Sequence, residues 1–135
     1  MTAIDTSVAV AAALPWHESH ARARSVVSRR KPRLIAQVAI ETYSVLTRLP
    51  PPQRVSASIA WTYLQETFVR PALVLAPTGY VELLDVAAAA GIVGGAVYDA
   101  LVAATAREAG AELLTLDERA VKTYHLVGVE YHIVR

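Results

Sequence analysis

Five short apolar segments alternate along this chain with longer segments that have the composition of helices. This alternation constrains the fold more than any other feature, because short strands separated by helices form a parallel sheet with helices on both faces. The expected strands are Thr2–Ile4, Leu34–Ala36, Leu73–Leu75, Glu112–Leu116 and Val129–Val134. We therefore predict an α/β/α sandwich with a central, mostly parallel sheet.

Prolines and glycines mark the ends of the helical segments, since proline lacks the N–H that a helix interior needs and glycine readily ends a helix. The expected helices are Val8–Leu14, His17–Arg30, Gln37–Leu49, Gln53–Val69, Gly79–Ala90, Ala96–Ala109 and Glu118–Tyr124. No repeat or low-complexity linker interrupts the pattern, and a chain of 135 residues suits one core. We expect residues 1–135 to form a single domain.

Composition limits the possible functions. Hydrophobic residues make up 54% of the chain, and no cysteine is present, which excludes disulfides and thiolate metal sites and favours an intracellular, cytoplasmic protein. The uncharged stretch Val86–Tyr98 is shorter than the roughly 20 apolar residues of a membrane span, so we expect no membrane association. The net charge of +1 means that any nucleic-acid contact must come from a local patch.

Two acidic residues follow expected strands. Asp5 comes directly after the first strand, and Asp117 directly after Leu113–Leu116. In open α/β sheets, ligands bind outside the carboxyl ends of the strands. Each aspartate could instead be a simple helix N-cap.

Two further acids lie on expected helices. Glu41 shares a helix face with Val38 and Val45, so it is placed toward the sheet. Asp99 lies near the start of the most apolar helix of the chain. A solvated face for Glu41 and a favourable interaction of Asp99 with the helix dipole are the structural alternatives.

The four acids together indicate a metal site. Carboxylates that gather at one edge of a sheet repel each other and raise each other's pKa, and a divalent cation relieves that repulsion. Hard oxygen ligands without cysteine or an obvious histidine triad suit Mg²⁺ or Mn²⁺.

The order of these acids resembles that of PIN domains, and within them the VapC-type toxins of bacterial toxin–antitoxin pairs. Four segments carry the resemblance, which covers essentially the whole chain: Ile4–Val8, Ala39–Tyr43, Tyr98–Ala103 and Leu114–Asp117. The likeness implies a single PIN-like nuclease domain that acts as an endoribonuclease with Mg²⁺ or Mn²⁺. Asp5, Glu41, Asp99 and Asp117 match the family's acidic quartet of catalytic and metal-binding residues, and Thr6 and Thr115 match hydroxyls that support the site.

The resemblance also implies partners. Toxins of this kind hydrolyse RNA phosphodiesters, are usually homodimers, and are held inactive by a small antitoxin protein. The densest basic segment of the chain could position the RNA backbone, although a solvated helix end is the simpler alternative. Its residues are Arg22, Arg24, Arg29, Arg30, Lys31 and Arg33.

Other interpretations remain open at this point. A receiver-like regulatory domain also gathers acids around Mg²⁺, but this chain has a single aspartate after the first strand, and its only late lysine, Lys122, falls in a short helix. A PIN-like fold could also serve only to bind a partner, because activity cannot be read from ligands alone. His17 and His20 have a spacing that can bind Zn²⁺, with no third ligand nearby.

Overall fold

A computed structural model describes residues 1–135, except for the side chains of residues 69 and 70. Its elements are, in chain order, β1 (Thr2–Ile4), α1 (Thr6–Ala13), α2 (His20–Arg30), β2 (Arg33–Ile35), α3 (Ala36–Thr47), α4 (Ala57–Thr67), β3 (Val69–Leu73), α5 (Pro77–Ala90), α6 (Ala96–Glu108), β4 (Glu112–Thr115), α7 (Val121–Val127) and β5 (Tyr131–Ile133). The expected α/β architecture is confirmed.

The sheet has five strands in the order β3-β2-β1-β4-β5, and every neighbouring pair is parallel. The sheet is thus entirely parallel rather than mostly so. After β1 the chain builds outward through β2 to β3, and then returns to place β4 on the other side of β1. This reversal leaves a switch point between the carboxyl ends of β1 and β4, where such sheets bind ligands. A receiver-like sheet has the strand order 2-1-3-4-5 instead. The receiver-like interpretation is therefore wrong.

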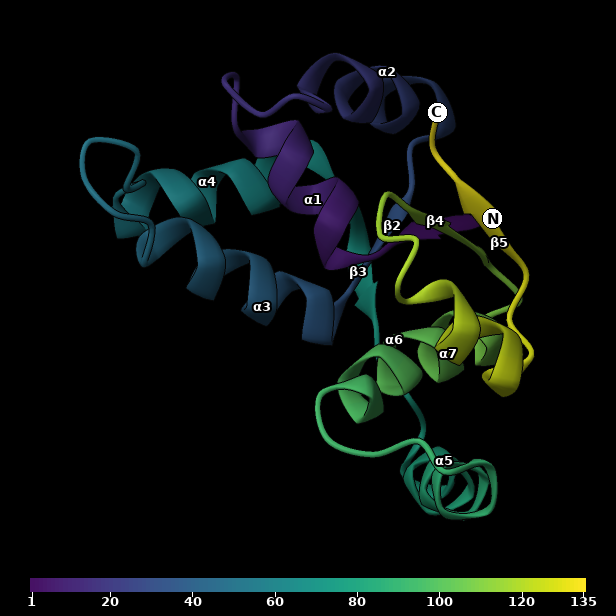
Figure 1. Ribbon diagram of the computed structural model, residues 1–135. Coiled ribbons are helices and arrows are strands. Elements are labelled where there is room, and N and C mark those ends of the chain that lie inside the picture. Colours follow the sequence, from purple (N-terminus) through teal and green to yellow (C-terminus); the bar gives the residue numbers. More distant parts are fainter.

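Helices cover both faces of the sheet (Figure 1). Helices α1 and α2 pack together on one face, whereas α6 and α7 pack together on the other, with α5 resting on α6. The sheet core is apolar: Ile4, Leu113 and Leu114 are completely buried. Small side chains on the facing helices, such as Ala9 of α1 and Ala103 of α6, are also completely buried. The close packing of these small residues brings the helix N-termini up to the switch point.

The structure differs most from the sequence-based expectation at β3. The expected helix Gln53–Val69 ends at Thr67, and the strand lies at Val69–Leu73 rather than at Leu73–Leu75. Pro71 predicts a helix stop and argues against a strand in a sheet interior. However, β3 is an edge strand, where proline is tolerated because its missing N–H faces no partner.

Three helices begin later than expected, because local hydrogen bonds form turns before them. One is α4, which begins at Ala57 rather than at Gln53. The segment expected to be helical from His17 becomes α2 only at His20, since the Ser19 N–H donates to His17 Nδ1 at 3.0 Å. Similarly, α7 begins at Val121 rather than at Glu118. No helix in the described part of the chain is long and apolar enough to span a membrane.

Candidate active site

The switch point places Asp5 and Asp117 at one edge of the sheet. The backbone N–H of Asp5 donates to the carbonyl of Leu114 at 3.1 Å, so the end of β1 stays paired with β4. Asp117 follows two residues beyond the end of β4. The two aspartates, separated by more than a hundred residues, are therefore neighbours because β1 and β4 are neighbours.

Asp5 is the most buried of the four acids, with 4% of its surface exposed. Its Oδ1 accepts hydrogen bonds from the Ser7 hydroxyl and, at 3.3 Å, from the backbone N–H of Val8. Its Oδ2 accepts from the Thr115 hydroxyl and, at 2.8 Å, from the Tyr124 hydroxyl. Burial raises the pKa of Asp5, and the four hydrogen bonds oppose that rise.

The hydroxyls of Ser7 and Thr115 also hold the loop after β4. Ser7 Oγ accepts from the Leu116 N–H at 2.8 Å, and Thr115 Oγ1 accepts from the Asp117 N–H at 2.9 Å. Each hydroxyl thus donates to Asp5 and accepts from the backbone of this loop. As a result, the position of Asp117 is tied directly to that of Asp5.

Glu41 reaches the same edge from α3. Its carboxylate accepts from the Thr6 hydroxyl at 2.6 Å and from Gln37 Nε2 at 2.8 Å. The contact with Thr6 links the second turn of α3 to the first residue of α1. This places Glu41 beside the end of β1 rather than on a solvated helix face.

Asp99 lies in the first turn of α6 and is half-buried. Its pKa is raised to about 6, first by burial and then by the negative charges of Asp117, Asp5 and Glu41. Only Arg119 acts in the opposite direction. The electrostatic coupling shows that the four carboxylates share one environment.

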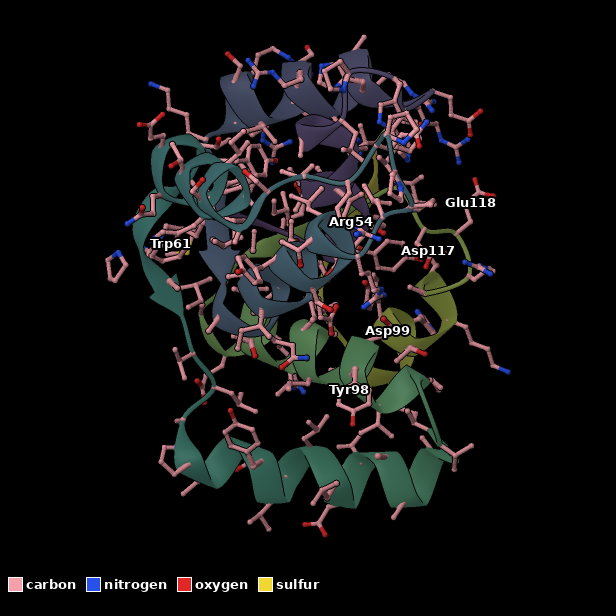
Figure 2. The ribbon with its side chains drawn as sticks, turned by 90° about the vertical axis from the view of Figure 1, so that its left-hand side faces the viewer. Arg54, Trp61, Tyr98, Asp99, Asp117 and Glu118 are labelled. Carbon is pink, nitrogen blue, oxygen red and sulfur yellow. The ribbon has the colours of Figure 1, made fainter. Side chains whose placement is uncertain are left out.

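All four acids line a single small cavity of about 60 Å³. Thr6, Ser7, Val102 and Tyr124 complete its lining, and no basic side chain takes part. Figure 2 shows Asp99 and Asp117 on the same side of the molecule, with Glu118 farther out. The arrangement concentrates negative charge in one place, and the exposed Arg119, whose Nε lies 3.4 Å from Asp117 Oδ1, is the basic side chain that pairs with one of the four acids.

The chemistry of this cavity fits a hard divalent cation. Its donors are carboxylate and hydroxyl oxygens, which Mg²⁺ and Mn²⁺ prefer, and the raised pKa of Asp99 reports a repulsion that a cation would relieve. In the side-chain positions described, no group of three or more histidine or acidic residues is spaced to hold one ion. Most of the carboxylate oxygens are instead turned to hydrogen-bond donors of the chain, as at Asp5 and Glu41.

A family profile described as "PIN domain" matches residues 2–126. The chain belongs to the PIN-domain family. Among curated proteins it is 48% identical to Ribonuclease VapC40 of Mycobacterium tuberculosis over 134 residues, covering 99% of each chain. It is 44% identical to Ribonuclease VapC27 of the same species over 132 residues, covering 98% of this chain and 94% of the relative. The expected likeness to the VapC group is therefore confirmed.

Solved structures agree with this PIN fold at low sequence identity. "Structure of FitAB bound to IR36 DNA fragment" matches with a TM-score of 0.74 at 16% identity, covering 98% of this chain and 94% of the other. "Crystal Structure of FitAcB from Neisseria gonorrhoeae" matches with a TM-score of 0.70 at 17% identity, covering 97% and 96%. At these identities the likeness concerns the fold alone.

The basic segment of this PIN domain is divided between the two edges of the sheet. Helix α2 runs from the acid edge toward the edge where the strands begin. The carbonyl of Arg30 accepts from the Thr2 hydroxyl at the start of β1, and its guanidinium pairs with Glu112 at the start of β4 at 2.7 Å. Arg33 donates to the carbonyl of Pro71. Arg30 and Arg33 are therefore engaged far from the acids.

The other members of the basic segment differ in position. Arg22, near the start of α2, lines a groove of about 380 Å³ together with Asp117, Arg119 and Arg135; Glu18 and Glu118 line the same groove. Arg24 and Lys31 line a different cavity, and Arg29, in the last turn of α2, is exposed. Of the six basic residues, only Arg22 shares a groove with one of the four acids.

The histidines of the Zn²⁺ alternative are engaged locally. His17 Nδ1 accepts from the Ser19 N–H, and His20 Nδ1 lies 2.9 Å from the carbonyl of Ala11. The two residues do not share a helix face, because α2 begins only at His20.

Sequence reasoning does not find Ser7 and Tyr124 as residues of this site. The local pattern assigns Ser7 to a helix cap and Tyr124 to the end of a short helix. Their roles depend on contacts between the residues just after β1 and segments more than a hundred residues away. Only the likeness to the family could have directed attention to Ser7, which lies within one of the matching segments.

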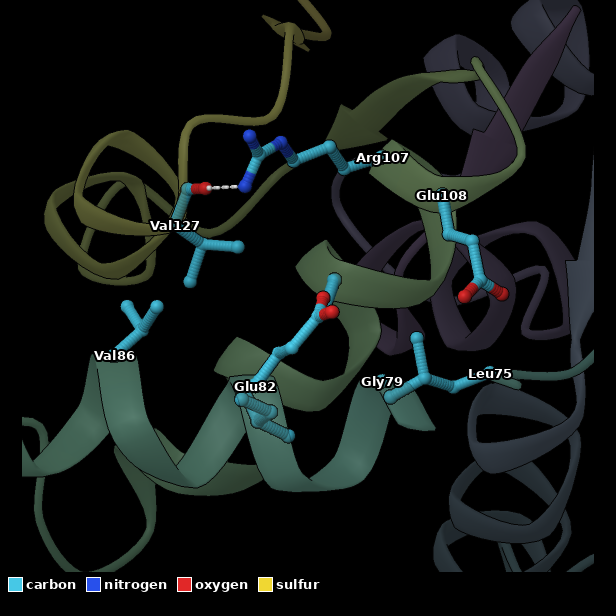
Figure 3. A pocket seen from close by; sticks show the side chains of 9 residues that line it. Leu75, Gly79, Glu82, Val86, Arg107, Glu108 and Val127 are labelled. Atoms are coloured by element: carbon cyan, nitrogen blue, oxygen red, sulfur yellow. Dashed lines mark hydrogen bonds between the residues drawn. The ribbon is translucent and has the colours of Figure 1, made fainter. Parts of the chain in front are cut away.

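A second, larger cavity lies where α5 approaches α6 and α7 (Figure 3). It has a volume of about 270 Å³ and is lined mainly by apolar side chains, with Glu82, Arg107 and Glu108 at its wall. Arg107 donates to the carbonyl of Val127 at 3.1 Å, and Glu108 accepts from the Ala76 N–H at 2.9 Å. Two of these charged side chains thus hold neighbouring elements together.

Proposed function

We propose that this PIN domain is a metal-dependent endoribonuclease that hydrolyses RNA phosphodiesters, and that it is the toxin of a toxin–antitoxin pair. One observation carries the proposal: four carboxylates from separate elements line one cavity at the switch point of the sheet. The names of the relatives, Ribonuclease VapC40 and Ribonuclease VapC27, support the reaction class.

Asp5, Glu41, Asp99 and Asp117 would hold one or two Mg²⁺ or Mn²⁺ ions. Such an ion, when bound, activates water and neutralises charge on the phosphate under attack. The chain itself supplies the negative charge of the site and holds the carboxylate oxygens in fixed orientations. Thr115, Ser7 and Tyr124 fix the orientation of Asp5, and Thr6 fixes that of Glu41.

Asp99 has the strongest claim to respond to a cation, because its carboxylate is destabilised first by burial and then by three neighbouring acids. A positive charge in the cavity would lower its pKa and favour the ionised form. We therefore choose Asp99 for the decisive variant.

Partners follow from the same proposal. The substrate would be RNA, the inhibitor a small antitoxin protein, and the active form a homodimer. The solved FitAB structure supports a paired system for a protein of this fold. A PIN fold that only binds a partner remains the competing function, and an assay of RNA cleavage separates the two.

The first experiment compares the wild-type protein with Asp99→Asn, which is nearly isosteric but removes a negative charge. Both proteins are freed of any co-purified inhibitor and incubated with total RNA in Mg²⁺, Mn²⁺ or EDTA. We expect discrete fragments from the wild type with metal and none with EDTA. The variant should lose at least about 100-fold in rate, the loss typical of removing a key electrostatic group in a site.

Asp85→Asn is the matched control, because Asp85 is an exposed aspartate of α5 outside the cavity. It should cleave RNA at the wild-type rate. Cleavage that persists in EDTA, or in Asp99→Asn, would contradict the metal-dependent site. Inactivity of every protein with every metal and RNA would favour the partner-binding function.

A further inference from the structure

Tyr124 is the largest completely enclosed side chain of the molecule's described part, with 1% of its surface exposed. It lies in α7, and its hydroxyl donates to Asp5 Oδ2 at 2.8 Å. The same residue lines the cavity of the four acids. Tyr124 thus brings the last helix of the chain into contact with the carboxylate that follows the first strand.

The phenol is well suited to act as a permanent donor. The ordinary pKa of a tyrosine hydroxyl is about 10, so this group carries its proton at physiological pH. A buried hydroxyl between an apolar core and a carboxylate has one favourable orientation, in which it donates to the carboxylate. The hydroxyl therefore fixes Asp5 Oδ2.

Asp5 is held by donors on both oxygens. Ser7 and Val8, which hold Oδ1, belong to the chain that directly follows Asp5. Thr115 and Tyr124, which hold Oδ2, come from the other side of the switch point. Thr115 also accepts the Asp117 N–H, whereas the Tyr124 hydroxyl makes no second hydrogen bond among the described residues. Removing the hydroxyl of Tyr124 would thus act on Asp5 alone.

Packing provides a second role that must be separated from the first. The ring of Tyr124 lies 6.3 Å from that of Tyr131, centre to centre, and forms part of the main core. Phenylalanine would retain this packing. Only the hydroxyl distinguishes an effect on Asp5 from an effect on the core.

We propose that Tyr124 is a positioning residue of the carboxylate cavity, and that its hydroxyl, by orienting Asp5, sets the affinity of the site for a divalent cation. This inference rests on the proposed function, since it assumes that the cavity binds Mg²⁺ or Mn²⁺. Groups that orient metal ligands typically account for roughly 10- to 100-fold in metal affinity or activity.

The test uses Tyr124→Phe in the full-length chain. Isothermal titration with Mn²⁺ should show a dissociation constant roughly 10- to 100-fold higher than that of the wild type. In RNA cleavage at a fixed Mn²⁺ concentration below saturation, kcat should fall while KM for RNA stays unchanged, because the buried hydroxyl cannot touch the substrate. A structural defect would lower the active fraction without changing the dissociation constant for Mn²⁺.

Tyr63→Phe is the matched control. The Tyr63 hydroxyl also makes one hydrogen bond, which is part-buried, donating to the carbonyl of Ala9 at 2.7 Å, and Tyr63 does not line the acid cavity. Both variants remove one tyrosine hydroxyl that donates a hydrogen bond, and Tyr124→Phe should lower the Tm more, because its lost bond is to a carboxylate. Only Tyr124→Phe should bind Mn²⁺ more weakly.

A second measurement keeps the inference testable if Tyr124→Phe does not fold. Fluorotyrosine placed at position 124 retains the ring and the hydroxyl, and its ¹⁹F signal should shift in a saturable manner when Mg²⁺ is added. An unchanged signal, or a Tyr124→Phe variant that binds Mn²⁺ as tightly as the wild type or more tightly, would overturn the role of Tyr124. If the wild type itself binds no Mn²⁺, the metal-dependent function fails and this role fails with it.

Discussion

Asp5 and Asp99 belong to the same cavity, but the structure compensates their charges differently. Asp5 is buried and receives four hydrogen bonds, whereas Asp99 is half-buried and is surrounded by three other acids. Hydrogen bonds stabilise the ionised form of Asp5, although burial still dominates its pKa. We therefore expect a positive charge in the cavity to affect Asp99 more than Asp5.

The raised pKa of Asp99 predicts a pH-dependent cost to folding in the metal-free protein. Its pKa of about 6 in the folded chain exceeds the ordinary value of 3.8, so the folded state binds the proton more tightly than the unfolded state. The stability contribution is complete below about pH 4 and is lost as the pH rises through about 6. In EDTA, Asp99→Asn should thus have a higher Tm than the wild type at about pH 7.5, and this difference should shrink toward about pH 4.

Thermal unfolding in EDTA across this pH range checks the expectation. Asp85→Asn, at an exposed position of α5, serves as the control and should show no comparable change between the two pH values. A difference between Asp99→Asn and the wild type that is independent of pH would mean that Asp99 is not destabilised by its neighbours.

At the scale of the element, the structure explains which sequence predictions succeeded. Asp5 and Asp117 could be placed because an acid after a parallel strand must lie at the carboxyl edge of the sheet. The pairing of β1 with β4 cannot be derived from the local sequence pattern. The contact of Ser7 with the loop after β4 and that of Tyr124 with Asp5 are therefore not predictable from the sequence. The strand containing Pro71 was misplaced, because its edge position is a property of the whole sheet.

The basic segment illustrates the same limit. Its charge is evident in the sequence, but the direction of α2 across the sheet is not. That direction places Arg22 in a groove with Asp117 and Arg119, whereas Arg30 and Arg33 bind to the edge where the strands begin. Arg119 has 95% of its side chain exposed, and its Nε pairs with Asp117 Oδ1 at 3.4 Å, so the other N–H groups of its guanidinium are free to donate to a phosphate.

The direction of α2 predicts which arginines contact RNA. In an Asp99→Asn background, which prevents cleavage, Arg22→Ala with Arg119→Ala should weaken RNA binding severalfold. It should also reduce the slope of log affinity against log salt by about 0.7 for each phosphate that the variant no longer neutralises. The pair Arg29→Ala with Lys31→Ala removes the same charge from the far end of α2 and should change the affinity little.

Fluorescence anisotropy with a labelled single-stranded RNA provides both quantities. Equal weakening in the two double variants would show that RNA is attracted by overall charge rather than by the groove beside Asp117. A larger effect of the Arg29 and Lys31 substitutions would place the substrate at the other end of α2.

At the scale of the whole molecule, the four acids and their supporting residues come from the residue after β1, from α1, α3, α6, β4 and α7, and from the loop after β4. The cavity exists only when all of these elements are packed together, so the unfolded chain cannot reproduce it. A ligand that binds only the folded state stabilises that state by mass action. Binding of a cation should therefore raise the free energy of unfolding and the Tm.

We expect Mg²⁺ to raise the Tm of the wild type. At about 100 times the dissociation constant the gain is about 2.7 kcal/mol, which for a chain of this size is a rise in Tm on the order of 10 °C. Asp117→Asn should show a much smaller rise. K⁺ at matched ionic strength is the control for general salt effects, and an equal rise with K⁺ would argue against a specific cation site.

The ties from Thr115 and Tyr124 to Asp5 have a consequence for biosynthesis. A polypeptide that is still being translated contains Asp5, Glu41 and Asp99 before it contains Thr115 and Tyr124, which hold Asp5 Oδ2. Until the segment from β4 to α7 has left the ribosome, β1 lacks one of its two neighbouring strands and the carboxylates have no common cavity. An RNA-cleaving protein built in this way would remain harmless to the message that encodes it until the segment from β4 to α7 has been made.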